Sequence, residues 1–437
     1  MLMDGNKKLL VFLLDALCAS DVDFLKGLPH MGRVLREGAL IEHVEPIYPS
    51  FTYPCHCAIV TGNTVKGHGI PHNEKLEVEN NNAPWYTQRS DIKCDTIFDY
   101  ARRAGLKTCS LSWPVSAGAD IDYNMPMIVP MHYIGYDPLH YLVGNASQNL
   151  LDEYYWKYSR YLKGVERSLD LFTMALAPDI IRDFGQPDLM YVKMCDLDSK
   201  RHNHGVKCPE AYEQLRKHDE EFAVLEESVR RYGDYDNTNF VILGDHGHQD
   251  IKHYVNMNMA LRDAGFIRTD ENNQLLDYDA YCFSTCMSGW VKLKNPDDRE
   301  MYKRVYEYLL SLRDDPDFPI GVVMTKEEVL DRYGLVGPLD FVIEGTEEEP
   351  TEFEATLAGE DIFKVHLGPG LYFSLASHGH MPERDETTTF FACGPSVKKG
   401  VVIPRTKMIN EAPTMAAMVG LNMDRCEGHV IKEILAD

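Results

Sequence analysis

The run Lys8-Leu-Leu-Val-Phe-Leu-Leu14, which ends directly before Asp15, decides the fold of this chain. An almost continuous apolar run of this length predicts a strand that is buried on both faces, as in parallel sheets. Three further apolar runs also end just before carboxylate or imidazole side chains. They cover residues 188–195, before Asp196 and Asp198; residues 239–243, before Asp245 and His246; and residues 371–375, before His378.

Segments with helical periodicity lie between these runs. Pro209 to Tyr232 carries apolar residues at helical spacing, and Thr96 to Gly105 predicts a helix that leads into a strand over residues 107–112. Strands that alternate with helices predict an α/β fold with a doubly wound, mostly parallel sheet flanked by helices. In such a sheet ligands bind beyond the carboxyl ends of the strands, so the polar residues after each run should converge there.

Two stretches are less regular than this alternation. Residues 116–163 are rich in Tyr, Pro and Met, and residues 278–366 combine strands, a helix and an acidic run. We interpret both as insertions in one catalytic domain that spans residues 1–437. The first is a Tyr-rich insertion near the active site, and the second is a smaller α+β subdomain.

The chain is strongly acidic. It has 44 Lys and Arg against 68 Asp and Glu, which gives a formal net charge of −24. This charge argues against binding to nucleic acids and to anionic membranes, because both depend on basic surfaces. A phosphate ligand would need a local positive charge, for which a bound metal is the best source.

The cysteines and the N-terminal sequence indicate a reducing compartment. Eleven Cys are scattered from Cys18 to Cys426 without zinc-ribbon spacing. No basic and apolar leader opens the chain, and the apolar run before Asp15 is too short to span a membrane. We therefore expect a cytoplasmic protein with a small-molecule substrate and no membrane partner. The sequence leaves the oligomeric state open.

Two short motifs carry candidate metal ligands. Asp245 and His246 are adjacent at a strand end and can both turn toward one cation, although a turn with a surface histidine is equally ordinary. Asp198 and His202 are four residues apart and lie on one face of a helical turn, a workable spacing for zinc. Asp196 competes with Asp198 as a ligand.

The last motif and the candidate nucleophiles leave choices open. Either His378 or His380 can supply a third imidazole, and the sequence does not decide between them. Ser50 and Thr52 precede an apolar helix, where free N–H groups and the helix dipole favour an anion, so either can be a nucleophile or an ordinary N-cap. Together with Asp15, these residues suffice for two divalent ions around one oxygen nucleophile.

The order and spacing of these residues resemble the nucleotide pyrophosphatase/phosphodiesterase (type I phosphodiesterase) family of the alkaline phosphatase superfamily. The resemblance extends over nearly the whole chain. Its motifs are Thr52-Tyr-Pro-Cys-His56, Val60-Thr-Gly62, His68-Gly-Ile70 with Asn73, Ser112-Trp-Pro114, Asp198-x-x-x-His202-x-x-Gly205, Asp245-His-Gly247 and His378-Gly379.

The resemblance implies an enzyme that hydrolyses phosphodiester or phosphoanhydride bonds through a phospho-threonine intermediate on Thr52. Asn73 would donate a hydrogen bond to a phosphoryl oxygen, Tyr53 would stack on a nucleobase, and Trp113 would contact the substrate. Two divalent metal ions, most simply Zn²⁺, would be bound. One would be held by Asp15, Thr52, Asp245 and His246, and the other by Asp198, His202 and His378.

Three alternatives stay open. A phosphomonoesterase shares the metals and the nucleophile, but such enzymes tend to add a cation, and no Arg lies near Thr52 in the sequence. A C–P bond hydrolase similar to phosphonoacetate hydrolase looks the same at this level. A non-catalytic metal-binding protein of this fold would be expected to have lost a ligand or the nucleophile, and none is missing.

Overall fold

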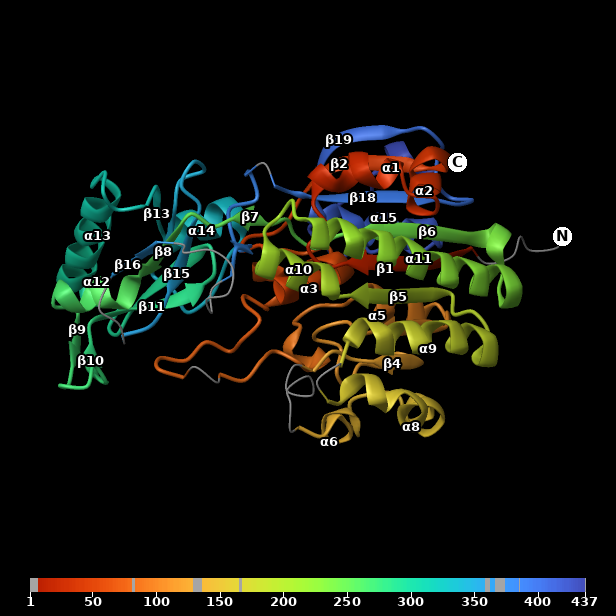
Figure 1. Cartoon of the computed structure of the whole chain (residues 1–437), viewed down its shortest axis with the longest axis horizontal. Helices are drawn as coiled ribbons and strands as arrows, with labels where there is room; N and C mark the ends of the chain where they lie inside the picture. Colours follow the sequence, from red (N-terminus) through yellow and green to blue (C-terminus); the bar gives the residue numbers. More distant parts are fainter. Residues whose placement is uncertain are drawn as a thin grey trace.

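A computed structural model describes residues 7–80, 83–128, 136–164, 167–357, 362–365, 374–384 and 386–436. Its centre is an eight-stranded sheet with the order β19-β2-β18-β6-β1-β5-β3-β4 (Figure 1). The strands are β1 (Lys8–Leu14), β2 (Ala39–Glu45), β3 (Thr108–Leu111), β4 (Tyr123–Met125), β5 (Leu189–Met194), β6 (Thr238–Leu243), β18 (Thr388–Cys393) and β19 (Val402–Lys407). Within this sheet β18 is antiparallel to both neighbours, and the other pairs are parallel. The mostly parallel sheet predicted from the sequence is confirmed.

Strand β1 shows why an apolar run specifies the middle of such a sheet. Successive side chains of a strand point to opposite faces. Leu9, Val11 and Leu13 enter the core on one face, whereas Leu10, Phe12 and Leu14 enter the core on the other. All six side chains are buried because helices cover both faces.

The helices divide between the two faces. α9 (Leu169–Phe184) and α11 (Pro209–Tyr232) contribute their apolar residues to the core on one face. α3 (Thr52–Thr61), α5 (Ile97–Arg103) and α15 (Glu411–Met418) contribute to the core on the other. This arrangement confirms the doubly wound fold, and α11 has the bounds that its periodicity predicts.

Shorter helices connect these elements. They are α1 (Val22–Lys26), α2 (Met31–Glu37), α4 (Val65–His68), α6 (Pro138–Leu142), α7 (Gln148–Leu150), α8 (Trp156–Tyr158) and α10 (Asp196–His204). The Tyr-rich stretch 116–163 contains β4, α6, α7 and α8, of which α6 and α8 lie at the lower edge of Figure 1. Among the described residues, every helix is too short or too polar to cross a membrane.

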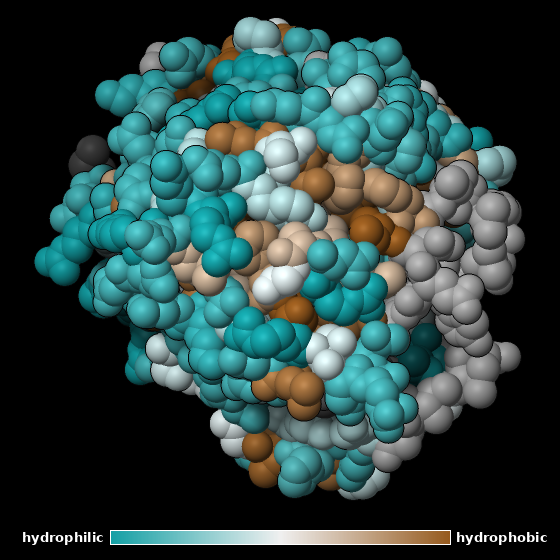
Figure 2. Space-filling view, turned by 90° about the vertical axis from the view of Figure 1, so that its left-hand side faces the viewer, coloured by the Kyte–Doolittle hydropathy of each residue, from teal (hydrophilic) through white to brown (hydrophobic). Residues whose placement is uncertain are grey.

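A smaller body lies at one end of the main sheet, at the left of Figure 1. Its four-stranded antiparallel sheet has the order β11-β12-β14-β13. The elements are β11 (Ala280–Thr285), β12 (Ser288–Leu293), α13 (Arg299–Arg313), β13 (Val322–Thr325), α14 (Lys326–Tyr333) and β14 (Phe341–Glu344). Figure 2 shows the molecule from this end, with hydrophilic side chains over most of the surface and apolar ones gathered across the middle.

Further small elements accompany this body. β8 (His253–Asn256) pairs with β15 (Thr351–Glu354) and β16 (Phe363–Val365), and β9 (Ile267–Thr269) pairs with β10 (Leu275–Tyr278). α12 (Met257–Asp263) lies beside them in Figure 1. Because β8 and α12 precede residue 278, the limits 278–366 for the inserted subdomain stay a prediction, as do the limits 116–163.

The fourth apolar run, residues 371–375, can be followed in the structure only in part. Residues 371–373 lie outside the described residues, and the strand found here is β17 (Ala376–Ser377). It pairs with β7 (Gln249–Asp250), which belongs to the segment that follows β6. The expected strand over residues 371–375 therefore stays a prediction.

Candidate metal centre and active-site cavity

The parallel register of the central strands brings the candidate residues to one edge. Leu14 of β1 is level with Met194 of β5, and Leu13 is level with Leu243 of β6. Asp15 and Asp245 follow directly beyond these strand ends. The expected convergence at the carboxyl edge is therefore what the register produces.

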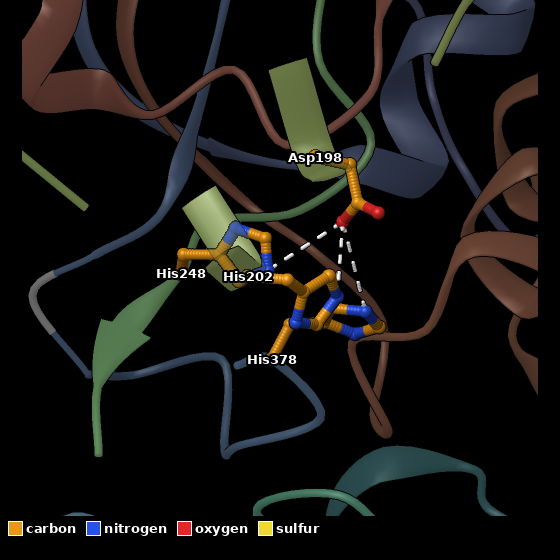
Figure 3. Close-up of side chains that lie close together, drawn as sticks. All are labelled: Asp198, His202, His248 and His378. Carbon is orange, nitrogen blue, oxygen red and sulfur yellow. Dashed lines mark ion pairs between the residues drawn. The ribbon is translucent and has the colours of Figure 1, made fainter. Parts of the chain in front are cut away.

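Four side chains beyond this edge form what we call the Asp198 cluster (Figure 3). It consists of Asp198, His202, His248 and His378. The Nε2 atoms of His202, His248 and His378 lie 3.4, 3.5 and 3.9 Å from Oδ1 of Asp198. This oxygen makes no hydrogen bond to any described residue. One potential ligand atom from each side chain lies within 4.8 Å of the others, so a single cation can contact all four.

Backbone carbonyls orient two of these imidazoles. Asp198 and His202 lie one turn apart on α10, and Nδ1 of His202 is 2.8 Å from the carbonyl oxygen of Ala376. Nδ1 of His378 is 2.9 Å from the carbonyl oxygen of Ser50. A histidine that binds metal through Nε2 commonly donates its Nδ1–H to such a partner. The geometry therefore fits a metal site.

A second group, the Asp15 cluster, lies against the first and contains Asp15, Asp198 and His246. Nε2 of His246 is 3.4 Å from Oδ1 of Asp15 and 3.3 Å from Oδ2 of Asp245. The hydroxyl of Thr52 is also 3.3 Å from this Nε2. Oδ1 of Asp15 and Oδ2 of Asp245 make no hydrogen bond to the described residues.

Unpaired carboxylate oxygens in a buried site are the donors that a divalent cation would satisfy. Burial raises the pKa of Asp245 well above its usual value. Burial opposes ionisation of Asp15 too, but Lys193 outweighs it and lowers the pKa of this carboxyl, with Nζ 2.6 Å from Oδ2. Leaving buried polar atoms unpaired costs about 1–3 kcal/mol each. The donor set of carboxylates and imidazoles therefore fits zinc.

The Asp198 carboxylate also controls the charge of the imidazole beside it. Burial favours neutral His202, but Asp198 outweighs this effect and raises the pKa of His202 to about 9. By contrast, burial holds the pKa of His248 and of His378 well below the usual value. Two of the three imidazoles are therefore neutral, as metal ligands must be.

Thr52 is better placed than Ser50 to act as a nucleophile. Thr52 is the first residue of α3, and its side chain lines the cavity. The hydroxyl of Ser50 donates to the carbonyl oxygen of His380 and accepts a hydrogen bond from the backbone N–H of Gly379. The geometry therefore favours Thr52 and gives Ser50 the role of tying two loops together.

A cavity of about 430 Å³ opens over both clusters. Seven of the candidate residues line it, namely Asp15, Thr52, Tyr53, Asn73, Asp198, His202 and His378. Oδ1 of Asn73 accepts a hydrogen bond from the backbone N–H of Tyr53, which leaves its NH₂ group as the donor. The predicted contact of Asn73 with a phosphoryl oxygen is therefore sterically reasonable.

The aromatic residues around the cavity differ from what the sequence indicates. Tyr53 lines the cavity but is fully buried, and its ring packs edge-on against Trp85, which lines the cavity too. Trp113 is absent from the described lining of this cavity and packs against His56 and Tyr191 in the core. The structure therefore gives no support to a substrate contact by Trp113.

The two competing ligands lie outside both clusters. Asp196 is on the cavity wall, where its carboxylate is 3.5 Å from Nζ of Lys217. His380 is buried, and its Nε2 is 3.4 Å from the carbonyl oxygen of Glu386. Among the described residues, His378 rather than His380 reaches the metal ligands.

Three residues of the site were not found from the sequence. His248 stands two residues after His246, beyond the Asp-His-Gly motif. Lys193 stands inside an apolar run, where the pattern indicates only a buried strand, and Trp85 lies in a segment without a recognisable pattern. Of the three, only His248 had a detectable signal, because it extends a motif that was already a ligand candidate.

The chain has an alkaline-phosphatase-like fold. A mouse ectonucleotide pyrophosphatase/phosphodiesterase 5, solved as an inactive variant in complex with AMP, superposes with a TM-score of 0.69 at 16% identity, covering 98% of this chain and 100% of that chain. The human protein of the same name gives a TM-score of 0.67 at 17% identity, covering 99% of this chain and 100% of that chain.

The sequence comparisons give the family. Residues 9–343 match the family model described as type I phosphodiesterase / nucleotide pyrophosphatase, so the chain belongs to this family. The rat ectonucleotide pyrophosphatase/phosphodiesterase family member 7 is 22% identical over 409 residues, which are 92% of this chain and 81% of that protein. The human family member 1 is 23% identical over 273 residues, 59% of this chain and 26% of that protein.

These comparisons confirm three of the predictions from sequence. They confirm the family, the fold, and an enzyme with phosphodiesterase or nucleotide pyrophosphatase activity. The non-catalytic alternative is thereby set aside.

Proposed function

We propose that this enzyme cleaves phosphodiester or phosphoanhydride bonds in nucleotide-like small molecules, with Thr52 as the nucleophile and two bound zinc ions. The observation that carries the proposal is the position of the Thr52 hydroxyl. It lies at the N-terminus of α3, 3.3 Å from Nε2 of His246, beside carboxylate oxygens that accept no hydrogen bond from a described residue.

The two clusters, together with Thr52 and Asp245 beside the Asp15 cluster, would supply the ligands for the two ions. Asp198, His202 and His378 would hold one ion, and Asp15, Thr52, Asp245 and His246 would hold the other. Mixed nitrogen and oxygen donors favour zinc over magnesium or calcium. Bound zinc would favour the deprotonated threonine and offset the charge of the phosphoryl group.

The residues of the chain then have defined tasks. The Thr52 oxygen forms a bond to phosphorus while the bond to the leaving oxygen breaks, which gives phospho-threonine and a leaving alcohol or phosphate. Water then attacks phosphorus and restores the Thr52 hydroxyl. The Asn73 amide donates to a non-bridging oxygen, and the positive end of the α3 dipole favours the negative charge there. The murine structural neighbour was solved with AMP, which supports a nucleotide as the ligand of this cavity.

The test compares two single variants with the wild type on a p-nitrophenyl phosphodiester. Thr52→Ala should abolish turnover while the protein still binds metal. Ser50→Ala is the control, and it should keep most of the activity if the protein folds. If Thr52→Ala is active and Ser50→Ala is inactive, Ser50 rather than Thr52 is the nucleophile. A wild-type enzyme that resists chelators would contradict the metal mechanism.

Hydrolysis of phosphomonoesters is a second candidate activity, because the structure contains a cation that the sequence did not reveal. Lys193 lines the same cavity as Thr52, and its side chain is fully buried beside Asp15. A monoester carries one more negative charge than a diester, and an ammonium group can offset it. A substrate panel of diesters, dinucleoside phosphates, monoesters and phosphonates decides between these activities by the ratio of kcat/KM values.

We also propose that the enzyme works in a reducing compartment. All eleven cysteines are free thiols, which agrees with the predicted cytoplasmic location. The relatives, however, are named as ecto-enzymes. Fractionation of the source cells, followed by immunodetection in the cytosolic, membrane and secreted fractions, decides the location.

A further inference from the structure

His248 is a buried histidine that the proposed mechanism leaves without a task. Its side chain is fully buried, and neither ring nitrogen makes a hydrogen bond to a described residue. A neutral imidazole has one donor and one acceptor, and burying both without partners costs several times RT. Another interaction should therefore offset the cost of burying this imidazole.

The fold directs this imidazole toward the Asp198 cluster. β7 and β17 pair antiparallel with Ser377 opposite Gln249, so the positions next to this pair, His248 and His378, lie side by side. The ring centroids of His248 and His378 are 5.2 Å apart, and those of His248 and His202 are 4.6 Å apart. Nε2 of His248 is 3.5 Å from Oδ1 of Asp198, slightly closer than Nε2 of His378 (Figure 3).

We infer that His248 is a fourth protein ligand of the ion at the Asp198 cluster. The inference rests on the proposed function, which places an ion there with three ligands. One carboxylate and three imidazoles give a donor set that selects Zn²⁺ and its transition-metal neighbours and discriminates against Mg²⁺ and Ca²⁺. Imidazole nitrogens and a carboxylate oxygen are donors that zinc commonly uses in proteins.

This ligand number makes the two ions unequal. The ion at the Asp198 cluster is held by three nitrogens and one oxygen, whereas the ion at the Asp15 cluster has a single imidazole among its donors. Zinc binds more firmly to the site with more nitrogen donors and better fixed ligands. A chelator should therefore remove the ion at the Asp15 cluster first and leave a species with one ion.

The experiment measures zinc affinity in three proteins. His248→Phe keeps the ring shape and removes both nitrogens. His380→Phe is the matched control, because His380 is also buried but lies outside both clusters. Each protein is stripped, loaded with zinc and titrated with chelators of graded strength, and the bound zinc is measured by elemental analysis. Cobalt-substituted samples report the coordination number through their visible absorption.

The wild type should lose its two ions in two separate steps, and His380→Phe should behave in the same way. Loss of a partner that supports a metal ligand lowers metal affinity by about 10–100-fold. In His248→Phe the zinc affinity of the tighter site should fall by more than this. Its cobalt spectrum should also change. In the chelated state His248→Phe should melt at the same temperature as the wild type or higher, because it removes two unpaired buried nitrogens.

Three results would overturn parts of this account, and they are distinguishable. Equal zinc affinities and cobalt spectra for the wild type and His248→Phe would refute the fourth ligand and leave the proposed function intact. A lower melting temperature of chelated His248→Phe, with unchanged zinc affinity, would make His248 a packing residue. A wild type that binds no zinc at all would refute the proposed function itself.

Discussion

Replacing Lys193 with Met should destabilise the metal-free enzyme far more than the zinc-loaded one. The Lys193 ammonium is 2.6 Å from Oδ2 of Asp15, and the two side chains are 0% and 5% exposed. Asp15 is also a proposed zinc ligand. The ammonium therefore supplies positive charge to the same carboxylate that a cation would use.

The size of the effect follows from this burial. Removing one partner of a buried ion pair leaves an unpaired charge and costs about 3–5 kcal/mol of folding free energy. Met keeps most of the volume of the lysine stem, so the cost of an added cavity should be small. When zinc is bound, the ion provides the missing positive charge, and most of the loss should disappear. Removal of the competing ammonium should also tighten zinc binding.

The assay is urea unfolding of wild type and Lys193→Met, with and without chelator, followed by circular dichroism. Lys107→Met is the control. Lys107 pairs with Asp122 at 2.8 Å, but its side chain is 65% exposed, so its loss should leave the unfolding midpoint nearly unchanged. Equal unfolding midpoints for chelated wild type and Lys193→Met would refute the argument. A loss of stability in Lys193→Met that is equal with and without zinc would also refute it.

Three further changes test other parts of the site and the fold. Trp85→Ala should raise KM for nucleotides by about 5–150-fold, because base stacking is worth about 1–3 kcal/mol. The KM for simple p-nitrophenyl esters should change less. An equal effect on both substrates would show that Trp85 does not recognise the base. His378→Ala should weaken the retention of one zinc ion, measured by elemental analysis after dialysis, and the reverse result with His380→Ala would reassign the ligand. Glu344→Gln should abolish the part of the pH dependence of unfolding free energy that the Glu344 carboxyl causes. Burial raises the pKa of Glu344 from 4.5 to about 7, although Arg384 opposes this shift. The protonated carboxyl therefore favours the folded state, and this contribution is complete below pH 4.5 and lost as the pH rises to about 7. By linkage, the free energy of unfolding falls by about 3 kcal/mol over this range. Melting temperatures of wild type and variant that change in parallel between pH 5 and 8 would contradict this prediction.

The central sheet was predictable because local pattern and tertiary position agree there. A strand covered by helices on both faces must be apolar at nearly every position. The run Lys8–Leu14 has this pattern, and few other environments in a protein suit it. Parallel register then places Asp15 and Asp245 at one edge without further information. The strand expected at residues 371–375 stays a prediction, because residues 371–373 lie outside the described residues.

The site was predictable only in part, because long-range geometry decides which residues meet. The Asp198 and His202 pair is local to one helix, so its spacing was sufficient. His248 reaches the same cluster through the pairing of β7 with β17, which joins segments more than a hundred residues apart in the sequence. Trp113 follows β3 in the chain but turns into the core against His56, which no spacing along the sequence indicates.

If the two clusters hold metal around the Thr52 hydroxyl, anomalous X-ray diffraction at the zinc edge will locate the ions. Crystals of the zinc-loaded enzyme should give one peak among Asp198, His202, His248 and His378. A second peak should lie among Asp15, Thr52, Asp245 and His246. A single peak, or peaks elsewhere on the protein, would contradict the account.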